Sequence, residues 1–270
     1  DRIARRTPQV VRKGFTSGAP DIMEVPSPNG DWLLSERDYD LWLRSGMDGN
    51  TQVLIDDGEE DYAWQIDGAQ WAPDAARVAV MKVDTRDNVR VPIVHWLKQT
   101  EDVEFFPYTK AGNPLPTQEL HVVDVYSKSA VQVDGGDEDQ FIHVVGWRPD
   151  GSELLILRMY RSWDHVQGLA ADPKTGDVRV VLEETNDSFI RGLEIAPGWR
   201  GLMRPLADGE HFVWLSQRDG WDHLYLYDLE GRLIRRLTEG AWPVMGVVHV
   251  DEDARQVYFT GHREERLYDT

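Results

Sequence analysis

Short apolar segments alternate with polar turns along the whole chain, and one pair of segments shows this most clearly. Residues 213–215 read Val-Trp-Leu, residues 224–227 read Leu-Tyr-Leu-Tyr, and the polar run Arg218-Asp219-Gly220 lies between them. Aromatic and branched side chains favour strands, and Asp-Gly favours the backbone of a tight turn. The pattern therefore predicts a β-hairpin at this place.

The hairpin is one copy of a repeated unit. The Trp-Asp-His sequence that follows its turn, at 221–223, occurs again at 163–165, and a looser copy of the region lies at 35–42. Each unit has a Pro-Asp-Gly-like turn, a short apolar strand, a polar turn and a strand rich in Leu, Val or Tyr. The turns that open the five copies lie at 27–30, 71–74, 147–151, 207–209 and 253–254.

Four strands in each unit, at a period of roughly 40–50 residues, are typical of β-propeller blades. We therefore expect an all-β fold, a β-propeller of four-stranded antiparallel blades, with residues 25–270 forming a partial propeller of about four to five blades. Residues 1–24 are expected to form a lead-in segment. The last unit stops at Thr270 before its outgoing strand, so the ring is expected to be incomplete. A β-sandwich is the alternative, but it does not predict the repeated turns.

Composition narrows the classes of partner. The net charge of -19 argues against nucleic acid and against anionic membranes, because both are bound through clustered Lys and Arg. The chain has no cysteine, which excludes disulfides and thiolate chemistry, and no apolar run is long enough to insert into a membrane. The compartment stays open, with the bacterial periplasm or cytoplasm as the expected settings.

Several polar motifs suggest chemistry but have simpler interpretations. Asp164-His165 and Asp222-His223 resemble catalytic dyads, yet they occupy the same place in two units, and turns repeat where active sites do not. The histidines lack the spacing of zinc ligands, and the acidic segment 134–139 lacks the register of a calcium loop. We therefore predict no catalytic residue, no metal site and no cofactor in this chain.

The most individual part of the chain is an insertion between residues 91 and 125. Its segment 106–114, Phe-Pro-Tyr-Thr-Lys-Ala-Gly-Asn-Pro, resembles the N-terminal propeller of the dipeptidyl peptidase IV family of serine peptidases, as do 83–86, 219–228 and 237–244. Two departures stand out. Thr109 replaces the usual proline, and Ala75-Ala76 interrupts the Asp-Gly turn of the second unit.

In that family an eight-bladed propeller covers a C-terminal α/β-hydrolase domain that holds a Ser-Asp-His triad. No Gly-x-Ser-x-Gly motif occurs here, so the resemblance implies that the catalytic domain lies beyond Thr270 and that this chain alone is inactive. The expected partners are peptide substrates and that hydrolase domain. A stand-alone propeller for protein–protein interaction is the alternative, and unpaired sheet edges would favour a homo-oligomer.

The resemblance also implies a site for the substrate's amino terminus. Members of the family bind the free α-amino group with a Glu-Glu pair that precedes a Trp-Ser-Pro-Asp-Gly turn, and Glu59-Glu60 precedes the turn at 71–74 at a similar distance. A buried ammonium needs carboxylate acceptors, so a pair of them is the expected chemistry. The aromatic residues that normally precede the pair are replaced by Asp56-Asp57-Gly58. A solvated loop between blades is the alternative for this acidic run.

Overall fold

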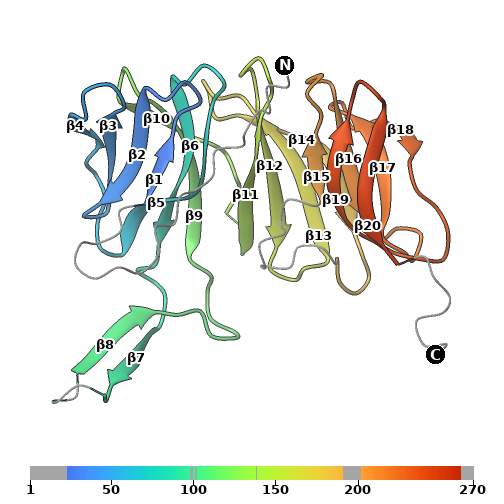
Figure 1. Ribbon diagram of the computed structural model, residues 1–270. Coiled ribbons are helices and arrows are strands. Elements are labelled where there is room, and N and C mark those ends of the chain that lie inside the picture. Colours follow the sequence, from blue (N-terminus) through green and yellow to red (C-terminus); the bar gives the residue numbers. More distant parts are fainter. Residues whose placement is uncertain (1–22, 98–99, 101, 138, 191–201, 263–270) are drawn as a thin grey trace. The chain divides into compact units, whose positions relative to one another are not determined.

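The computed structural model describes residues 23–97, 100, 102–137, 139–190 and 202–262, and the regular elements among them are strands (Figure 1). Most of the expected lead-in segment 1–24 and the end of the fifth unit, 263–270, lie outside these residues. The strands are β1 (Glu24–Pro26), β2 (Trp32–Arg37), β3 (Asp40–Ser45), β4 (Thr51–Ile55), β5 (Tyr62–Trp71), β6 (Arg77–Asp84), β7 (Arg90–His95), β8 (Asp102–Pro107), β9 (Thr117–Asp124), β10 (Ser129–Gln132), β11 (Gln140–Trp147), β12 (Leu154–Tyr160), β13 (His165–Ala171), β14 (Val178–Thr185), β15 (Met203–Pro205), β16 (His211–Ser216), β17 (His223–Asp228), β18 (Leu233–Arg236), β19 (Val244–Asp251) and β20 (Gln256–Gly261).

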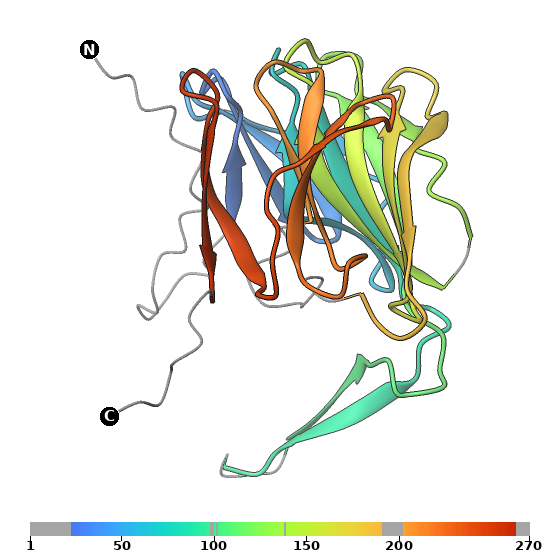
Figure 2. The same ribbon diagram turned by 90° about the vertical axis from the view of Figure 1, so that its right-hand side faces the viewer.

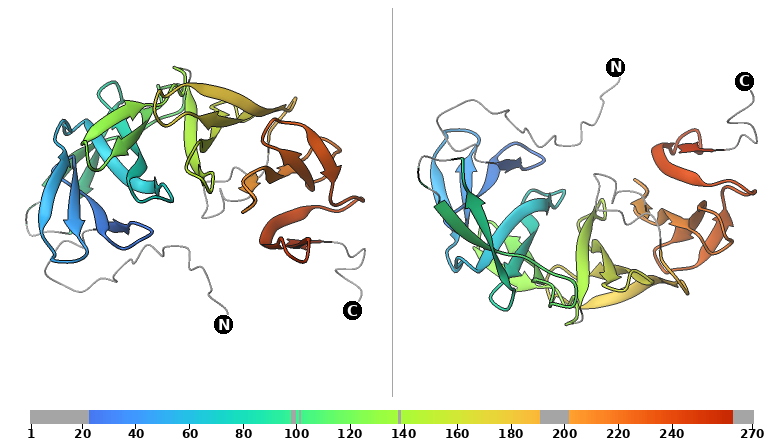
Figure 3. Two further views of the ribbon diagram at one scale, coloured as in Figure 1. Left: turned by 90° about the horizontal axis from the view of Figure 1, so that it is seen from above. Right: turned by 90° about the horizontal axis from the view of Figure 1, so that it is seen from below.

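Sixteen of these strands form four sheets of four strands each. Their orders are β1-β2-β3-β4, β10-β9-β6-β5, β11-β12-β13-β14 and β15-β16-β17-β18, and the remaining strands form the two-stranded sheets β7-β8 and β19-β20. In Figure 3 the strands of the first sheet, in blue, follow one another across the sheet. The antiparallel four-stranded blades expected from the repeat are confirmed, and with them the all-β propeller fold class.

The chain divides into two compact units. Among the described residues, the first holds those within 23–140 and 173–176, and the second holds those within 141–172 and 177–262. The core of the first unit lies between its two blades, where apolar side chains of β2, β3, β5 and β6 meet. Trp64, at 1% exposure, is its largest fully buried side chain. β6 has no exposed residue, as is typical of a strand that is covered on both faces.

The second unit has a separate core of large side chains from its own blades. Phe212 and Trp214 on β16 are fully buried and pack with Leu155, Leu157 and Met159 on β12. The hairpin predicted from the first pattern is β16–β17, which pair from His211 opposite Asp228 to Ser216 opposite His223. Gly220 in its turn has a φ of 86°, a conformation that glycine adopts without steric cost.

The insertion in the second blade forms a hairpin that extends from its sheet. Strands β6 and β9 pair directly from Asp84 opposite Thr117 to Arg77 opposite Asp124, and β7–β8 lies between them in the sequence. Figures 1 and 2 show this hairpin standing clear of the four-stranded sheet to which it is connected. Its apolar side chains are correspondingly exposed, including Trp96 at 73% and Phe105 at 58%.

Ala75 keeps the turn of the second blade despite the missing glycine. Its φ is 57°, in the left-handed region that alanine rarely adopts, and the residue is buried. Ala75 N–H donates to the Ala72 carbonyl at 2.9 Å, which closes the turn. The Asp-Gly turn predicted to be spoiled is therefore formed in spite of its sequence.

Within the described ranges, no helix is both long enough and apolar enough to cross a membrane.

Candidate functional site

The acidic run 56–61 connects the first blade to the second, between β4 and β5. Glu59 and Tyr62 exchange two backbone hydrogen bonds of 3.0 Å, so that Glu60 and Asp61 occupy the tip of a tight turn. Glu59 and Glu60 are both exposed, and the Glu60 side chain retains 71% of its accessible surface. The turn 59–62, called the acidic turn below, thus places three successive carboxylates at the surface.

The first blade holds the acidic turn from one side. Gly58 N–H donates to Asp40 Oδ1 at 2.8 Å, and Trp64 N–H donates to the Tyr39 carbonyl at 3.1 Å. A Cβ on residue 58 would lie only 2.0 Å from the Tyr39 oxygen, so only glycine permits this approach. The β2–β3 turn of the first blade therefore fixes where the chain enters the acidic turn.

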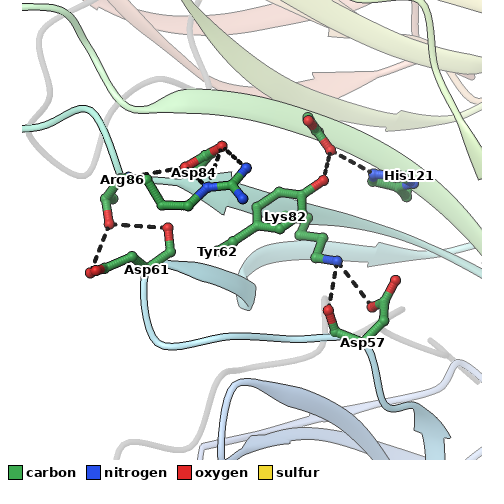
Figure 4. A network of polar contacts seen from close by, with 9 residues as sticks. Asp57, Asp61, Tyr62, Lys82, Asp84, Arg86 and His121 are labelled. Carbon is green, nitrogen blue, oxygen red and sulfur yellow. Dashed lines mark hydrogen bonds and ion pairs between the residues drawn. The ribbon is translucent and has the colours of Figure 1, made fainter.

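The second blade holds the same segment from the other side (Figure 4). Lys82 Nζ on β6 donates to the Asp57 carbonyl at 2.9 Å and lies 3.1 Å from Asp57 Oδ1. Trp64 Nε1 donates to that same carboxylate oxygen at 2.7 Å. Burial raises the pKa of Asp57, but these two hydrogen bonds and the lysine charge outweigh burial and leave the pKa below its usual value.

A layer of polar groups lies beside Lys82 on β5 and β9. The Tyr62 hydroxyl donates to Glu119, and His121 Nε2 lies 3.5 Å from the same carboxylate. Burial, together with the hydrogen bond to Glu119, raises the pKa of Tyr62 to about 12, so the phenol stays protonated. Burial lowers the pKa of His121, so the ring is neutral at neutral pH. The phenol of Tyr62 is therefore not a base at neutral pH.

Two arginines partly offset the negative charge of the acidic turn. Arg90, the first residue of β7, lies 2.7 Å from Asp61 Oδ1 and 3.7 Å from Glu60 Oε1. Arg86 pairs with Asp84, which lowers the pKa of that carboxyl, and its guanidinium packs over the Tyr62 ring at 4.8 Å. Carboxylates still outnumber cations at this end of the blade, so the local field favours a positively charged ligand.

The structure places the two glutamates predicted from the sequence in one turn, but in different positions. Glu59 is the first residue of the turn and Glu60 is at its tip, where its neighbour is Asp61. Sequence reasoning included Asp61 only as part of the acidic run, and it missed Lys82. For Lys82 a signal was present, because a lysine interrupts the apolar run Val78-Ala79-Val80-Met81-Lys82-Val83 in a strand that reads as buried.

The two Asp-His motifs have different contacts in their blades. His223 is fully buried, with Nδ1 3.0 Å from Thr238 Oγ1 and Nε2 2.9 Å from the Gly240 carbonyl. His165 is partly exposed, bonds Glu183 through Nε2 and stacks on Tyr160. His223 therefore bonds the segment that follows β18, and His165 bonds the neighbouring strand β14.

The acidic segment 134–139 is organised by the protein's own groups. Gln140 Nε2 donates to the carbonyls of Gly135 and Gly136 at 2.8 and 2.9 Å, and Asp139 accepts the Leu115 N–H at 3.3 Å. Across the part of the chain that the structure describes, no group of three or more His, Asp or Glu side chains is arranged to hold a metal ion.

Comparison with known proteins supplies the family. Residues 6–269 match the model of the dipeptidyl peptidase IV (DPP IV) N-terminal region. A probable dipeptidyl peptidase 4 of Emericella nidulans is 26% identical over 276 residues, which is 90% of this chain and 35% of that protein. Dipeptidyl peptidase 4 of Trichophyton rubrum is 24% identical over 87% of this chain and 32% of its own length.

Solved structures show the same fold. The crystal structure of Porphyromonas gingivalis dipeptidyl peptidase 4 has a TM-score of 0.79 at 21% identity, covering 91% of this chain and 36% of that one. A putative dipeptidyl aminopeptidase IV from Bacteroides ovatus has a TM-score of 0.75 at 18% identity over 90% and 37%. The chain spans about a third of the length of the curated relatives that it matches. It belongs to the family of dipeptidyl peptidase IV N-terminal regions.

Proposed function

We propose that this chain is the non-catalytic propeller portion of a dipeptidyl peptidase IV-like serine exopeptidase. In this proposal the parent protein has a C-terminal α/β-hydrolase domain, residues 25–270 restrict access to it, and Glu59 and Glu60 bind the amino terminus of a peptide substrate. The observation that supports the proposal best is the acidic turn, which holds these two exposed carboxylates and Asp61 within three residues.

The contacts of the acidic turn suit recognition of an ammonium group. Opposed charges at hydrogen-bonding distance bind strongly when the acceptors are held in place beforehand, because little conformational freedom is lost on binding. The segment that leads into the turn is fixed by two contacts: Gly58 bonds the first blade and Asp57 bonds the second blade. Arg90 forms ion pairs with Glu60 and Asp61, so a bound ammonium would share these carboxylates with Arg90.

The decisive experiment uses the complete protein and a chromogenic dipeptide substrate with a free amino terminus. Glu59→Gln with Glu60→Gln should reduce kcat/KM by at least about a hundredfold, because two charge-assisted contacts of about 1.5–3 kcal/mol each are lost. The matched control, Asp56→Asn with Asp67→Asn, removes two negative charges from exposed neighbours and should leave kcat/KM within about twofold. Wild-type kinetics in the double glutamine variant would refute the role of the pair.

A protein-interaction scaffold is the second candidate, and the exposed hairpin β7–β8 favours it. Trp96, Leu97 and Phe105 expose 73%, 86% and 58% of their surfaces, and contiguous exposed apolar surface is typical of interaction sites. This surface is also available for the homo-oligomer expected from the sequence. Sedimentation of the wild type beside a Trp96→Ser, Phe105→Ser double variant tests this. Association of the wild type alone supports an interaction through the hairpin. If both proteins associate, or neither does, the hairpin is not the interaction surface.

A further inference from the structure

Lys82 is buried to an unusual degree for a lysine. Its side chain is 5% exposed, and among the described residues it is the one lysine or arginine that ranks as buried. Taking an ammonium group out of water is costly unless carboxylates and other acceptors replace the lost hydration. The side chain lies in β6 between half-buried Met81 and buried Val83, so its charged end must be directed at such partners.

The partners of Lys82 belong to the segment that enters the acidic turn. Its Nζ contacts both the carbonyl and the carboxylate of Asp57, at 2.9 and 3.1 Å. The ammonium also lies 4.0 Å from the centre of the Tyr62 ring and 5.3 Å from that of Trp64. Figure 4 shows Lys82 between Tyr62 and Asp57, the residues on either side of 58–61. One buried cation thus holds both ends of the segment that contains Glu59 and Glu60.

Cations over aromatic rings also occur in the other blades, but with different partners. Arg37 lies over Trp42, Arg158 over Tyr160 and Arg218 over Tyr225, at 5.5, 5.6 and 4.5 Å from the ring centres. None of these arginines is buried. The contact between a cation and a ring is therefore a recurring packing device, whereas the bond from a buried ammonium to the chain beside the acidic turn distinguishes the second blade.

We infer that Lys82 and Asp57 are positioning residues for Glu59 and Glu60, holding the acidic turn at the distance from the scissile bond that a dipeptide requires. This inference rests on the proposed function. Lys82 touches no ligand in this mechanism; it acts through Asp57. Removing it frees the segment 56–58 and leaves the carboxylates present but displaced, so the substrate's ammonium is bound more weakly in the ground state and the transition state alike.

The test is made in the complete protein with Lys82→Met, which keeps the aliphatic chain and removes the ammonium. KM for a dipeptide substrate with a free amino terminus should rise by about tenfold or more, with kcat within about threefold. As a second readout, the inhibition constant of a free dipeptide is compared with that of its N-acetyl form. The preference for the free amine should fall by at least about tenfold, an effect that general loosening of the fold does not produce.

Asp57→Asn is the second variant, because the Asp57 side chain is 62% exposed and its replacement opens no cavity. This variant should also lose the preference for the free amine. If Lys82→Met does not fold, Asp57→Asn alone tests the positioning role. Lys128→Met is the control: Lys128 also donates to a backbone carbonyl, that of Val53 at 2.7 Å, but is exposed and does not contact the acidic turn. Its KM and its preference should match the wild type.

The outcomes separate this inference from the proposed function. If the double glutamine variant at Glu59 and Glu60 keeps the wild-type preference for a free amine, the proposed function fails. If that variant loses the preference while Lys82→Met and Asp57→Asn keep it within twofold, the positioning role alone is overturned. Loss of the preference in all three variants, with Lys128→Met unchanged, supports both.

Discussion

Gly58→Ala tests how tightly the first blade holds the acidic turn. The added Cβ would lie 2.0 Å from the Tyr39 carbonyl oxygen, 2.5 Å from its carbon and 2.9 Å from Asp40 Oδ1. The two closest of these atoms belong to the backbone of a tight hairpin turn. They cannot avoid the added Cβ by a change of rotamer, as a side chain could. The segment 57–59 must therefore retreat until the closest contact exceeds 3.0 Å, a movement of about 1 Å.

A retreat of that size breaks named hydrogen bonds. The Gly58 N–H bond to Asp40, now 2.8 Å, and the Lys82 bond to the Asp57 carbonyl, now 2.9 Å, would both lengthen beyond hydrogen-bonding distance. Each involves a charged group and contributes about 1.5–3 kcal/mol. Allowing for partial relaxation, we expect the free energy of unfolding to fall by about 2–4 kcal/mol.

Urea denaturation of the chain, followed by tryptophan fluorescence and far-UV circular dichroism, measures this change. Gly246→Ala is the matched control, because a Cβ there meets no atom within 4 Å and its φ is not in the left-handed region. That variant should stay within about 0.5 kcal/mol of the wild type. If Gly58→Ala is no less stable than Gly246→Ala, the close approach at Tyr39 does not fix the turn and the reasoning is refuted.

Three further predictions concern single side chains. Burial lowers the pKa of His121 below 6.5, so the unfolded chain binds a proton before the folded chain does as the pH falls. The free energy of unfolding should therefore decline below about pH 6.5. His121→Gln should flatten that decline, as measured by urea denaturation at several pH values. Tyr62→Phe should cost about 1 kcal/mol in the same urea assay through the lost bond to Glu119, and no loss would mean that water replaces the hydroxyl. His223→Ala should lower the free energy of unfolding in thermal denaturation by about 3 kcal/mol, because the buried ring and its two contacts are lost. The exposed control His249→Ala should change that free energy by less than about 0.5 kcal/mol.

Much of the fold could be predicted because it depends on local patterns. The strands expected at 213–215 and 224–227 correspond to β16 and β17, and the Asp-Gly turn at Gly220 lies where expected. Strand alternation and turn residues act over a few positions, so a single sequence reveals them. Ala75 is the exception, since the surrounding blade forces a turn that its own sequence disfavours.

Only part of the candidate site could be predicted from the sequence, and the reason is physical. Glu59 and Glu60 were predicted through the resemblance, from their distance to the turn at 71–74. The contacts that hold the segment beside them span long separations in the sequence. Lys82 is 25 residues from Asp57, and Asp40 is 18 residues from Gly58. Such contacts depend on how neighbouring strands are placed, which no local pattern reports. The lysine within an apolar strand was the one available signal of a buried ion pair.

The hairpin β7–β8 enters and leaves its blade at neighbouring positions, since Asp84 lies opposite Thr117. A segment with adjacent ends can be lengthened, shortened or exchanged during evolution without changing the sheet that bears it. Here the exchange would not be neutral, because Arg90 at the start of the hairpin supplies a charge to Glu60 and Asp61. Replacing the hairpin would therefore change the charge beside the acidic turn together with the exposed surface of the blade.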